Sequence, residues 1–314
     1  FLLGNLFIFI PAMLYSGSLF IQTMFNVDLP LMLIAVAFAV VGSAYAVLGG
    51  LRAVAVSDAY SGVLLLTLGV VVVVLSLATV DFDLSGIPAE RLTMIGDSST
   101  PIPWHTLLTG MVFIQIFYWG TNQTITQRAM ASPTVEEGQK GVLAAAAIRL
   151  MIIPPLVVIP GIVSYKLYGD VGDAAFGLIV RDVLPLWLSG AFAAAIAAAV
   201  LTSVNSVLNS STTLWVCDIH EPFINPNADL RRLNLVITVS FVLIGLAMVP
   251  LYATADSIIN LVQELYGLLS MPILSAFIVG LLFRDVAAGA AITAVVLGVL
   301  LYAFFSFVWA PLHY

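Results

Sequence analysis

The sequence is dominated by apolar stretches that are each long enough to cross a lipid bilayer. The hydrocarbon core of a bilayer is about 30 Å thick, which a helix of roughly 20 apolar residues spans. Because lipid offers no hydrogen bonds to the backbone, such stretches form helices that pair their own polar groups. Nine of them occur, at 2–24, 29–48, 59–80, 104–123, 141–167, 186–216, 233–251, 258–283 and 286–309. The sequence therefore predicts an all-α, multi-pass membrane protein.

Composition excludes several other classes of protein. Hydrophobic residues make up 61% of the 314 residues and charged residues 9%, far outside the range of a soluble globular domain. The single cysteine, Cys217, excludes a disulfide framework and a multi-cysteine metal site. There is no basic patch for nucleic acid and no GxxxxGK[ST] or HExxH motif. We therefore expect neither an enzyme nor a bound cofactor, and no nucleic-acid partner.

The distribution of Lys and Arg predicts how the chain is oriented, because cytoplasmic loops carry the positive excess. One side of the predicted topology holds Arg52, Arg128, Lys140, Arg231, Arg232 and Arg284, and the other holds Arg91, Lys166 and Arg181. The first side is therefore expected to be cytoplasmic, with residue 1 on that side and residue 314 outside. The chain begins with Phe1 inside an apolar run, so we expect it to be a fragment of a longer protein.

The sixth apolar stretch carries an unusual set of hydroxyl and amide side chains. Each such group costs roughly 2–7 kcal/mol to bury in an apolar medium without a partner. One face of the predicted helix holds Thr202, Ser206, Asn209 and Thr213, with Ser203 and Ser210 beside it. Hard cations such as sodium prefer several oxygen ligands, but small polar residues also join neighbouring helices in membranes. The spacing alone leaves both interpretations open.

Other polar residues fall inside apolar stretches. Arg149 lies deep in the fifth stretch, where it either pairs with a carboxylate such as Glu264 or lines a solute path. Gln115 and Tyr118 are three residues apart and share a helix face that suits a polyhydroxylated ligand, although a packed tyrosine is an equally ordinary interpretation.

Two further polar positions have both a functional and an ordinary explanation. Gln263 lies beside Glu264 in the eighth stretch, where both side chains need polar surroundings, and one of them could contact a solute. Asp58 follows Ser57 just before the third stretch, where a helix N-cap is the ordinary explanation.

Four segments together resemble the sodium/solute symporter family, which includes sodium/glucose, proline, iodide and sialic-acid cotransporters. They are GGLRAVAVSD (49–58), FYWGTNQTITQRAM (117–130), QKGVLAAAAIRL (139–150) and LTSVNSVLNSSTTLWVCDIH (201–220). The resemblance covers essentially the whole chain and implies a leucine-transporter-like fold of two inverted five-helix repeats. It places the last three helices of the first repeat at 1–80, the second repeat at 104–283 and an additional helix at 286–309. It also implies that the first two core helices are absent.

The resemblance assigns expected roles to residues. Sodium would bind the Ala199 carbonyl and the Thr202 and Ser203 hydroxyls. A second sodium site, present in some members, maps to Asp58, Thr202, Asn205 and Ser206, but Asn205 departs from the usual hydroxyl and leaves the number of ions open. Gln115, Tyr118, Arg149 and Gln263 match solute-contacting or gating positions. Arg149 stands where sugar transporters have lysine.

We therefore expect a sodium-coupled symporter in the cell membrane that imports a small organic solute by alternating access. Sodium serves as the coupling ion, and a sugar or polyol is the favoured solute. An amino acid, carboxylate or sialic-acid-like solute is the alternative, with Arg149 as its counter-charge. A symporter-like sensor module of a signalling protein is a further alternative.

Overall fold

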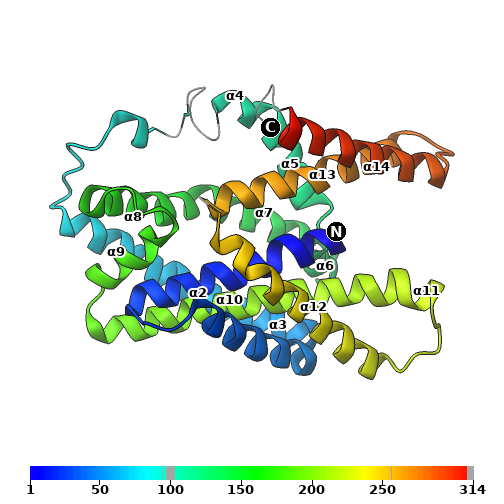
Figure 1. Ribbon diagram of the computed structural model, residues 1–314, viewed down its shortest axis with the longest axis horizontal. Coiled ribbons are helices and arrows are strands. Elements are labelled where there is room, and N and C mark those ends of the chain that lie inside the picture. The colour runs from blue at the N-terminus through cyan, green and yellow to red at the C-terminus, as the bar shows by residue number, and fades with distance from the viewer. Residues whose placement is uncertain (94, 97–102, 256, 310–314) are drawn as a thin grey trace. The chain divides into compact units, whose positions relative to one another are not determined.

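The computed structural model describes residues 1–93, 95–96, 103–255 and 257–309, and for residues 46–54 only the backbone. Every regular element in these ranges is a helix (Figure 1). Among the described residues, seven helical segments are long and apolar enough to cross a membrane. Two shorter apolar helices, Leu31–Tyr45 and Gly110–Gly120, correspond to the second and fourth predicted spans. The predicted all-α membrane architecture is confirmed.

The chain forms two compact units, each described by itself below. The small unit consists of Phe1, Thr93–Gln127 and Ile259–Tyr314, and the large unit of Leu2–Leu92 and Arg128–Ile258. The helices of the large unit are α1 (Leu2–Gly4), η1 (Asn5–Phe9), α2 (Ile10–Phe25), α3 (Leu31–Thr79), η2 (Ala89–Arg91), α7 (Val135–Met151), α8 (Ile153–Tyr168), η3 (Gly172–Ala174), α9 (Ala175–Val183), α10 (Leu186–Trp215), η4 (Val216–His220), α11 (Glu221–Phe223) and α12 (Leu230–Ala253). The small unit holds α4 (Trp104–Leu108), α5 (Gly110–Gly120), nearly all of α13 (Ile258–Leu282), α14 (Ala288–Ala303) and η5 (Phe304–Val308), and the boundary falls within α6 (Gln123–Met130).

Helix α3 contains both the second and the third predicted spans. Its ends, Leu31 and Thr79, enclose 49 residues without an assigned break. The Tyr45 hydroxyl nevertheless donates a hydrogen bond of 2.9 Å to the Ser57 hydroxyl. Twelve residues of straight helix measure about 18 Å, which is too far for these two side chains to meet. The helical chain therefore bends sharply between Tyr45 and Ser57.

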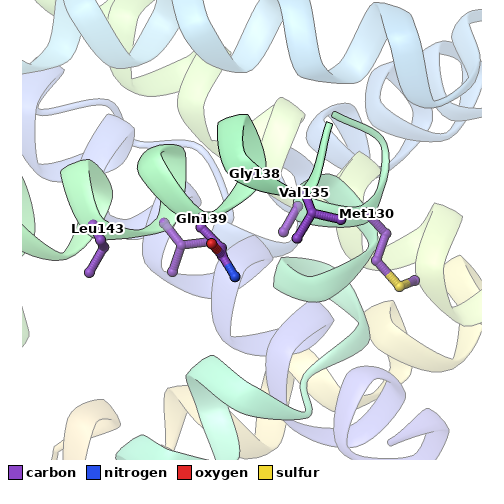
Figure 2. A pocket seen from close by; sticks show the side chains of 7 residues that line it. Met130, Val135, Gly138, Gln139 and Leu143 are labelled. Atoms are coloured by element: carbon purple, nitrogen blue, oxygen red, sulfur yellow. The ribbon is translucent and has the colours of Figure 1, made fainter. Parts of the chain in front are cut away.

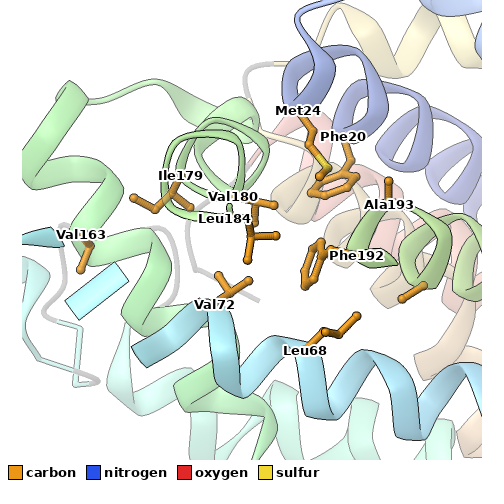
Figure 3. Packing of buried hydrophobic residues seen from close by; sticks show 11 residues of the cluster. Phe20, Met24, Leu68, Val72, Val163, Ile179, Val180, Leu184, Phe192 and Ala193 are labelled. Carbon is orange, nitrogen blue, oxygen red and sulfur yellow. The ribbon is translucent and has the colours of Figure 1, made fainter. Parts of the chain in front are cut away.

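The apolar core of the large unit gathers side chains from α2, α3, α8, α9 and α10 (Figure 3). Phe20 of α2 and Phe192 of α10 lie at its centre, with ring centroids 6.0 Å apart. Phe176 of α9 completes the group at 5.9 Å from Phe20 and 6.3 Å from Phe192. Offset and tilted aromatic pairs of this kind contribute about 0.5–1.5 kcal/mol beyond burial. The core thereby fixes α10 against α2 and α3.

Two features bring helices close together within the large unit. A Cβ built at Gly17 of α2 would lie 2.8 Å from the side chain of Val200 on α10, so only glycine permits this approach. The π-helical turn η1 leaves backbone carbonyls outside the regular ladder. The buried Tyr252 hydroxyl of α12 donates to the Phe7 carbonyl of this turn at 2.7 Å. Such π-helical turns, which also occur at η4 and η5, were not predicted from the sequence.

Proline and glycine positions account for several helix boundaries. Helix α7 ends at Met151, and α8 begins at Ile153 with Pro154 in its first turn, so the predicted fifth span is two helices in succession. Helix α5 ends at Gly120. Pro160 and Pro272, in contrast, lie inside α8 and α13 without ending them.

The start of α7 is also fixed locally. The Thr134 hydroxyl accepts a hydrogen bond of 3.2 Å from the Glu137 N–H, as in a capping box.

Two ion pairs join the segment that follows α3 to the C-terminal end of α8 and the loop after it. Arg91 lies 2.8 Å from Asp170 and stacks 4.3 Å above the Tyr165 ring, and Lys166 lies 3.2 Å from Asp83. Hydrogen bonds from the backbone N–H and the hydroxyl of Ser85, together with Lys166, lower the pKa of Asp83 to about 2. The hydrogen bond from Arg91 likewise lowers the pKa of the Asp170 carboxyl. The Arg91–Asp170 pair is well exposed, so it positions the segment more than it stabilises it.

Candidate site at helices α3, α6 and α10

Helix α10 carries the polar residues that the sequence singled out. It begins after Pro185, whose extended backbone precedes the first turn, and it continues to Trp215. Its most extensive packing is against α3. Buried polar side chains along α10 are Thr202, Asn205, Ser206, Ser210, Ser211 and Thr212. Of the predicted polar face, Thr202 and Ser206 are buried, whereas Asn209 and Thr213 are half-buried. The partners of these side chains decide what each residue does.

The three residues predicted to bind sodium lie within one turn of α10. The Thr202 hydroxyl donates to the Ala199 carbonyl at 3.2 Å, so these two expected ligands are adjacent. Ser203 is half-buried, and its hydroxyl makes no hydrogen bond with any part of the chain that the structure describes. Three oxygens within a turn are a partial coordination shell for a hard cation, which needs further ligands from elsewhere.

One turn further along α10, three side chains from separate elements meet. The Arg128 Nη2 of α6 lies 2.6 Å from the Asp58 Oδ2 of α3 and also donates to the Ser206 hydroxyl of α10. Ser206 Oγ in turn lies 3.5 Å from Asp58 Oδ2 and donates to the Thr202 carbonyl at 2.6 Å. Both charged side chains are about 30% exposed.

The interpretation of Asp58 as a helix N-cap is wrong. Asp58 lies inside α3, whose N-cap is Pro30, and its carboxylate pairs with Arg128. Among the residues of α3, Asp58 is the only acidic one in the sequence. A carboxylate among apolar residues requires a cationic or hydrogen-bonding partner, which Arg128 and Ser206 supply.

Asn205, which lies between Ser203 and Ser206 on α10, is fully buried. Neither its amide oxygen nor its amide nitrogen has a hydrogen-bond partner among the described residues. A buried amide without partners costs about 1–3 kcal/mol, so its retention requires an explanation.

The C-terminal part of the polar face makes a different kind of contact. Ser211 and Thr213 donate to carbonyls of their own helix, Val207 and Asn209, at 2.7 and 2.9 Å. The Thr212 hydroxyl lies 3.3 Å from the Thr238 hydroxyl of α12. This is the interhelical hydrogen bonding that the sequence left open as an alternative to ion binding.

The small unit contains three of the residues predicted to contact solute or form a gate. Tyr118 is half-buried, with its ring 6.1 Å from that of Tyr266 on α13. The Asn122 side chain donates to the Tyr266 hydroxyl at 3.5 Å and accepts a hydrogen bond from the Thr124 N–H, which starts α6. Gln115 is exposed on α5, and Gln263 is half-buried on α13. Tyr118 is therefore held by aromatic neighbours within its unit.

The remaining predicted solute residue, Arg149, belongs to the large unit. It lies exposed near the end of α7, in the helix that carries the family-like segment 139–150. The start of α7 also borders a hollow of about 510 Å³ (Figure 2). Its lining is apolar except for Gln139: Ala129, Met130, Val135, Gly138, Gln139, Val142 and Leu143. So apolar a hollow lacks the hydrogen-bonding groups that a sugar requires.

Sequence reasoning missed the roles of Arg128, Tyr266 and Asn122. Arg128 was used only to predict orientation, although a lone acidic residue in an apolar helix signals that a cation must lie nearby. Asn122 directly precedes α6, where asparagine is a preferred cap. Tyr266 carries no local signal, because its contacts come from residues 144 or more positions away.

Comparisons with known proteins identify the family and the fold. A model described as "Sodium:solute symporter family" matches residues 1–298. The chain is 33% identical to an uncharacterized symporter, YidK, of Escherichia coli over 96% of its length and 57% of that protein. It is 29% identical to a sodium/glucose cotransporter of Vibrio parahaemolyticus, over 96% of the chain and 62% of that protein. The chain thus spans about three fifths of the length of these relatives.

Other similarities concern a mammalian relative and a solved structure. A sodium/myo-inositol cotransporter 2 of Mus musculus is 26% identical over 92% of this chain and 49% of that protein. The solved structure is a substrate-bound outward-open state of a Na⁺-coupled sialic acid symporter, with a TM-score of 0.72 and 17% identity. That match covers 99% of this chain and 68% of the other. It confirms the predicted leucine-transporter-like fold.

Proposed function

The chain belongs to the sodium:solute symporter family, and on that premise we propose that the protein couples sodium entry to the import of a small organic solute. It is a multi-pass integral membrane protein of a transporter family, not an enzyme. The observation that carries the proposal is the turn of α10 from Ala199 to Ser203, which gathers carbonyl and hydroxyl oxygens inside a membrane helix. Hydroxyl and carbonyl oxygens are ligands that hard cations prefer.

In this proposal the ion is bound by the Ala199 carbonyl and the Thr202 and Ser203 hydroxyls. Thr202 is nearly buried, so its hydroxyl is shielded from bulk water. Ser203 supports the proposal because its hydroxyl has no competing hydrogen bond within the described chain. Thr202 and Ser203 lie in the family-like segment 201–220, and Ala199 lies two residues before it. Asp58, Asn205 and Ser206 remain the candidates for a second ion.

The driving force is sufficient for concentrative uptake. Moving one charge through 100 mV releases about 2.3 kcal/mol. At 1.36 kcal/mol per tenfold change, this supports roughly 50-fold accumulation before any sodium gradient is added. Alternating access needs no covalent chemistry.

We assign the solute to the class of sugars and polyols. Relatives at 25–33% identity include proteins named for glucose and myo-inositol. Tyr118 presents an aromatic ring held by Tyr266, and Gln115 and Gln263 offer amides. Rings and amides are groups that bind the apolar faces and hydroxyls of sugars.

An acidic solute is the second candidate, and Arg149 is the observation that favours it. Its guanidinium is exposed on α7, and a planar guanidinium binds carboxylates in a bidentate manner. Arg149→Lys separates the two candidates. We expect this change to weaken uptake of a carboxylate strongly, because lysine keeps the positive charge but cannot donate two parallel hydrogen bonds to a carboxylate. Uptake of a neutral sugar should stay within about threefold of the wild-type rate.

The test is uptake of labelled sugars, polyols, amino acids and sialic acid by the full-length protein in proteoliposomes, with and without a sodium gradient. We expect one sugar or polyol to accumulate only with sodium. Gln263→Ala should raise the half-saturating concentration of that solute, while Gln139→Ala, in the apolar hollow, should not. Uptake that persists at full rate without sodium would falsify the coupling. Unaltered affinity in Gln263→Ala would remove the solute assignment.

A further inference from the structure

A hollow of about 310 Å³ lies in the large unit at the C-terminal end of α8. Helix α8 ends at Tyr168, and so does a helical segment that is long and apolar enough to span a membrane. The topology predicted from the Lys and Arg positions puts this end on the outer side. Tyr165, which lines the hollow, is of the residue type enriched at the level of the lipid head groups. The hollow therefore lies where the membrane meets water.

The inner part of the hollow is apolar and follows one face of α8. Val158, Gly161, Ile162 and Tyr165 line it at helical spacing, and the helix rises about 10 Å from the first to the last. A Cβ built at Gly161 would meet nothing within 4 Å, so this glycine leaves the groove open. An open apolar groove in a membrane span suits an acyl chain, because lipid tails are as apolar as these side chains.

The outer rim of the hollow carries two opposite charges. Arg91 Nη2 lies 2.8 Å from Asp170 Oδ2, and the guanidinium lies 4.3 Å from the centre of the Tyr165 ring. The two charged side chains are 45% and 66% exposed, so a ligand can reach both. Within the described part of the chain, Arg91 donates no hydrogen bond other than that to Asp170. Its Nε and Nη1 therefore remain as donors.

These charges select the kind of head group that fits the rim. The remaining donors of Arg91 suit a phosphate, and the Asp170 carboxylate suits an ammonium group that can donate hydrogen bonds. A purely anionic head group would bring a second negative charge close to Asp170, which is unfavourable. A choline group has no N–H to donate, and one face of the Tyr165 ring, which could bind it, is covered by Arg91. A zwitterionic head group with a primary amine fits both charges.

We propose that this hollow binds one phospholipid of the phosphatidylethanolamine type. Its acyl chain lies over Gly161, its phosphate is bound by Arg91 and its ammonium group by Asp170. The lipid thereby joins η2, α8 and the loop after α8 at the outer surface of the membrane. None of these residues is among those assigned to sodium or to the solute, so the proposal does not depend on the proposed transport.

The test measures lipid binding to the purified full-length protein by native mass spectrometry. The probes are phosphatidylethanolamine, phosphatidylcholine and phosphatidylglycerol with identical acyl chains, and soluble glycerophosphoethanolamine, which has the head group without the chains. We expect one molecule of phosphatidylethanolamine to bind at least about tenfold more tightly than either of the other lipids, as one charge-assisted hydrogen bond allows. The soluble compound should bind far more weakly, because it buries no hydrocarbon.

Four variants relate this binding to single side chains. Gly161→Leu fills the groove and should abolish the saturable binding, and Arg91→Gln should lower the affinity for phosphatidylethanolamine at least about tenfold. Asp170→Asn removes only the partner of the ammonium group, so phosphatidylglycerol should then bind nearly as tightly as phosphatidylethanolamine. Lys166→Gln is the matched control, because Lys166 pairs with Asp83 nearby but does not line the hollow. It should bind the lipids as the wild type does.

Several outcomes would overturn the proposal. Equal affinity of the wild type for the three lipids would do so, and so would an unchanged lipid preference in Asp170→Asn. A soluble head group that binds as tightly as the lipid would indicate a site for free phosphate compounds instead. A full-length protein that binds none of the lipids would mean that something else covers the hollow. The comparison of lipids on the wild type needs no variant, so it decides even if a variant fails to fold.

Discussion

Helix α10 contains two polar stretches of similar composition that do different things. The stretch from Ala199 to Ser206 contacts a carboxylate and a guanidinium from other helices and contains a hydroxyl and an amide without partners. The stretch from Asn209 to Thr213 contacts its own backbone and a threonine of α12. In our proposal, the same residue types, serine, threonine and asparagine, serve for ion binding in the first stretch and for helix packing in the second. The partners, rather than the residue types, separate the two roles.

The largest effect on sodium affinity should come from a hydroxyl removed in the first stretch. We expect Ser203→Ala to raise the half-saturating sodium concentration of uptake at least about tenfold, since a lost ligand of about 1.4 kcal/mol has that effect. Thr213→Ala removes a hydroxyl nearly three turns away and should change the half-saturating sodium concentration less than about twofold. Equal effects of the two variants on the sodium dependence of uptake would contradict the separation of α10 into an ion-binding stretch and a packing stretch.

The largest effect on stability should come from breaking the ion pair of the first stretch. We expect Asp58→Asn to destabilise the protein by about 1.5–3 kcal/mol, because Arg128 then lacks its counter-charge. Arg128→Gln in the same chain should restore part of the loss. Asp170→Asn is the matched control, because its ion pair with Arg91 is much more exposed, and it should leave the melting temperature nearly unchanged. Thermal unfolding in detergent measures all four proteins.

Replacing Asn205 should change the stability by a smaller amount and in the opposite direction. Replacing its unpaired amide by a side chain of similar size, Asn205→Leu, should stabilise the sodium-free protein by about 1 kcal/mol, because the desolvation cost of the amide disappears. A loss of stability in this variant would mean that the amide has a structural partner. Thermal unfolding in sodium-free buffer decides between these outcomes.

The smallest effect should come from the second stretch. Thr212→Val should cost about 0.6 kcal/mol, the average for an interhelical hydrogen bond in a membrane protein. Thr212→Val combined with Thr238→Val should cost little more, because neither hydroxyl is then left alone. A double-mutant cycle on unfolding gives the coupling directly. An altered sodium affinity in Thr212→Val would extend the ion site beyond Ser206.

Much of the fold could be predicted because lipid imposes simple rules. Runs of about 20 apolar residues located the spans, and Pro154 and Gly120 lie at observed helix boundaries. The π-helical turns and the bend between Tyr45 and Ser57 could not be predicted. They depend on contacts such as that between Tyr252 and the Phe7 carbonyl, which join residues 245 positions apart.

The candidate site was predictable in its residues but not in its partnerships. Periodicity placed Thr202 and Ser206 on one face of α10, and the family resemblance selected Ala199, Thr202 and Ser203 as expected sodium ligands. The pairing of Asp58 with Arg128 joins positions 70 residues apart, and no local pattern encodes it. The separation of ion-binding from packing hydroxyls likewise depends on Thr238 of α12, which lies 26 residues from Thr212.

The central claim is that the first polar stretch of α10 binds sodium and the second does not. The most direct measurement is equilibrium ²²Na⁺ binding to purified full-length protein carrying either Thr202→Val/Ser203→Ala or Thr212→Val/Thr213→Val. We expect the first pair of changes to abolish saturable binding and the second pair to leave its affinity within about twofold of the wild type. Saturable binding that survives the first pair, or is lost only with the second, would contradict the claim.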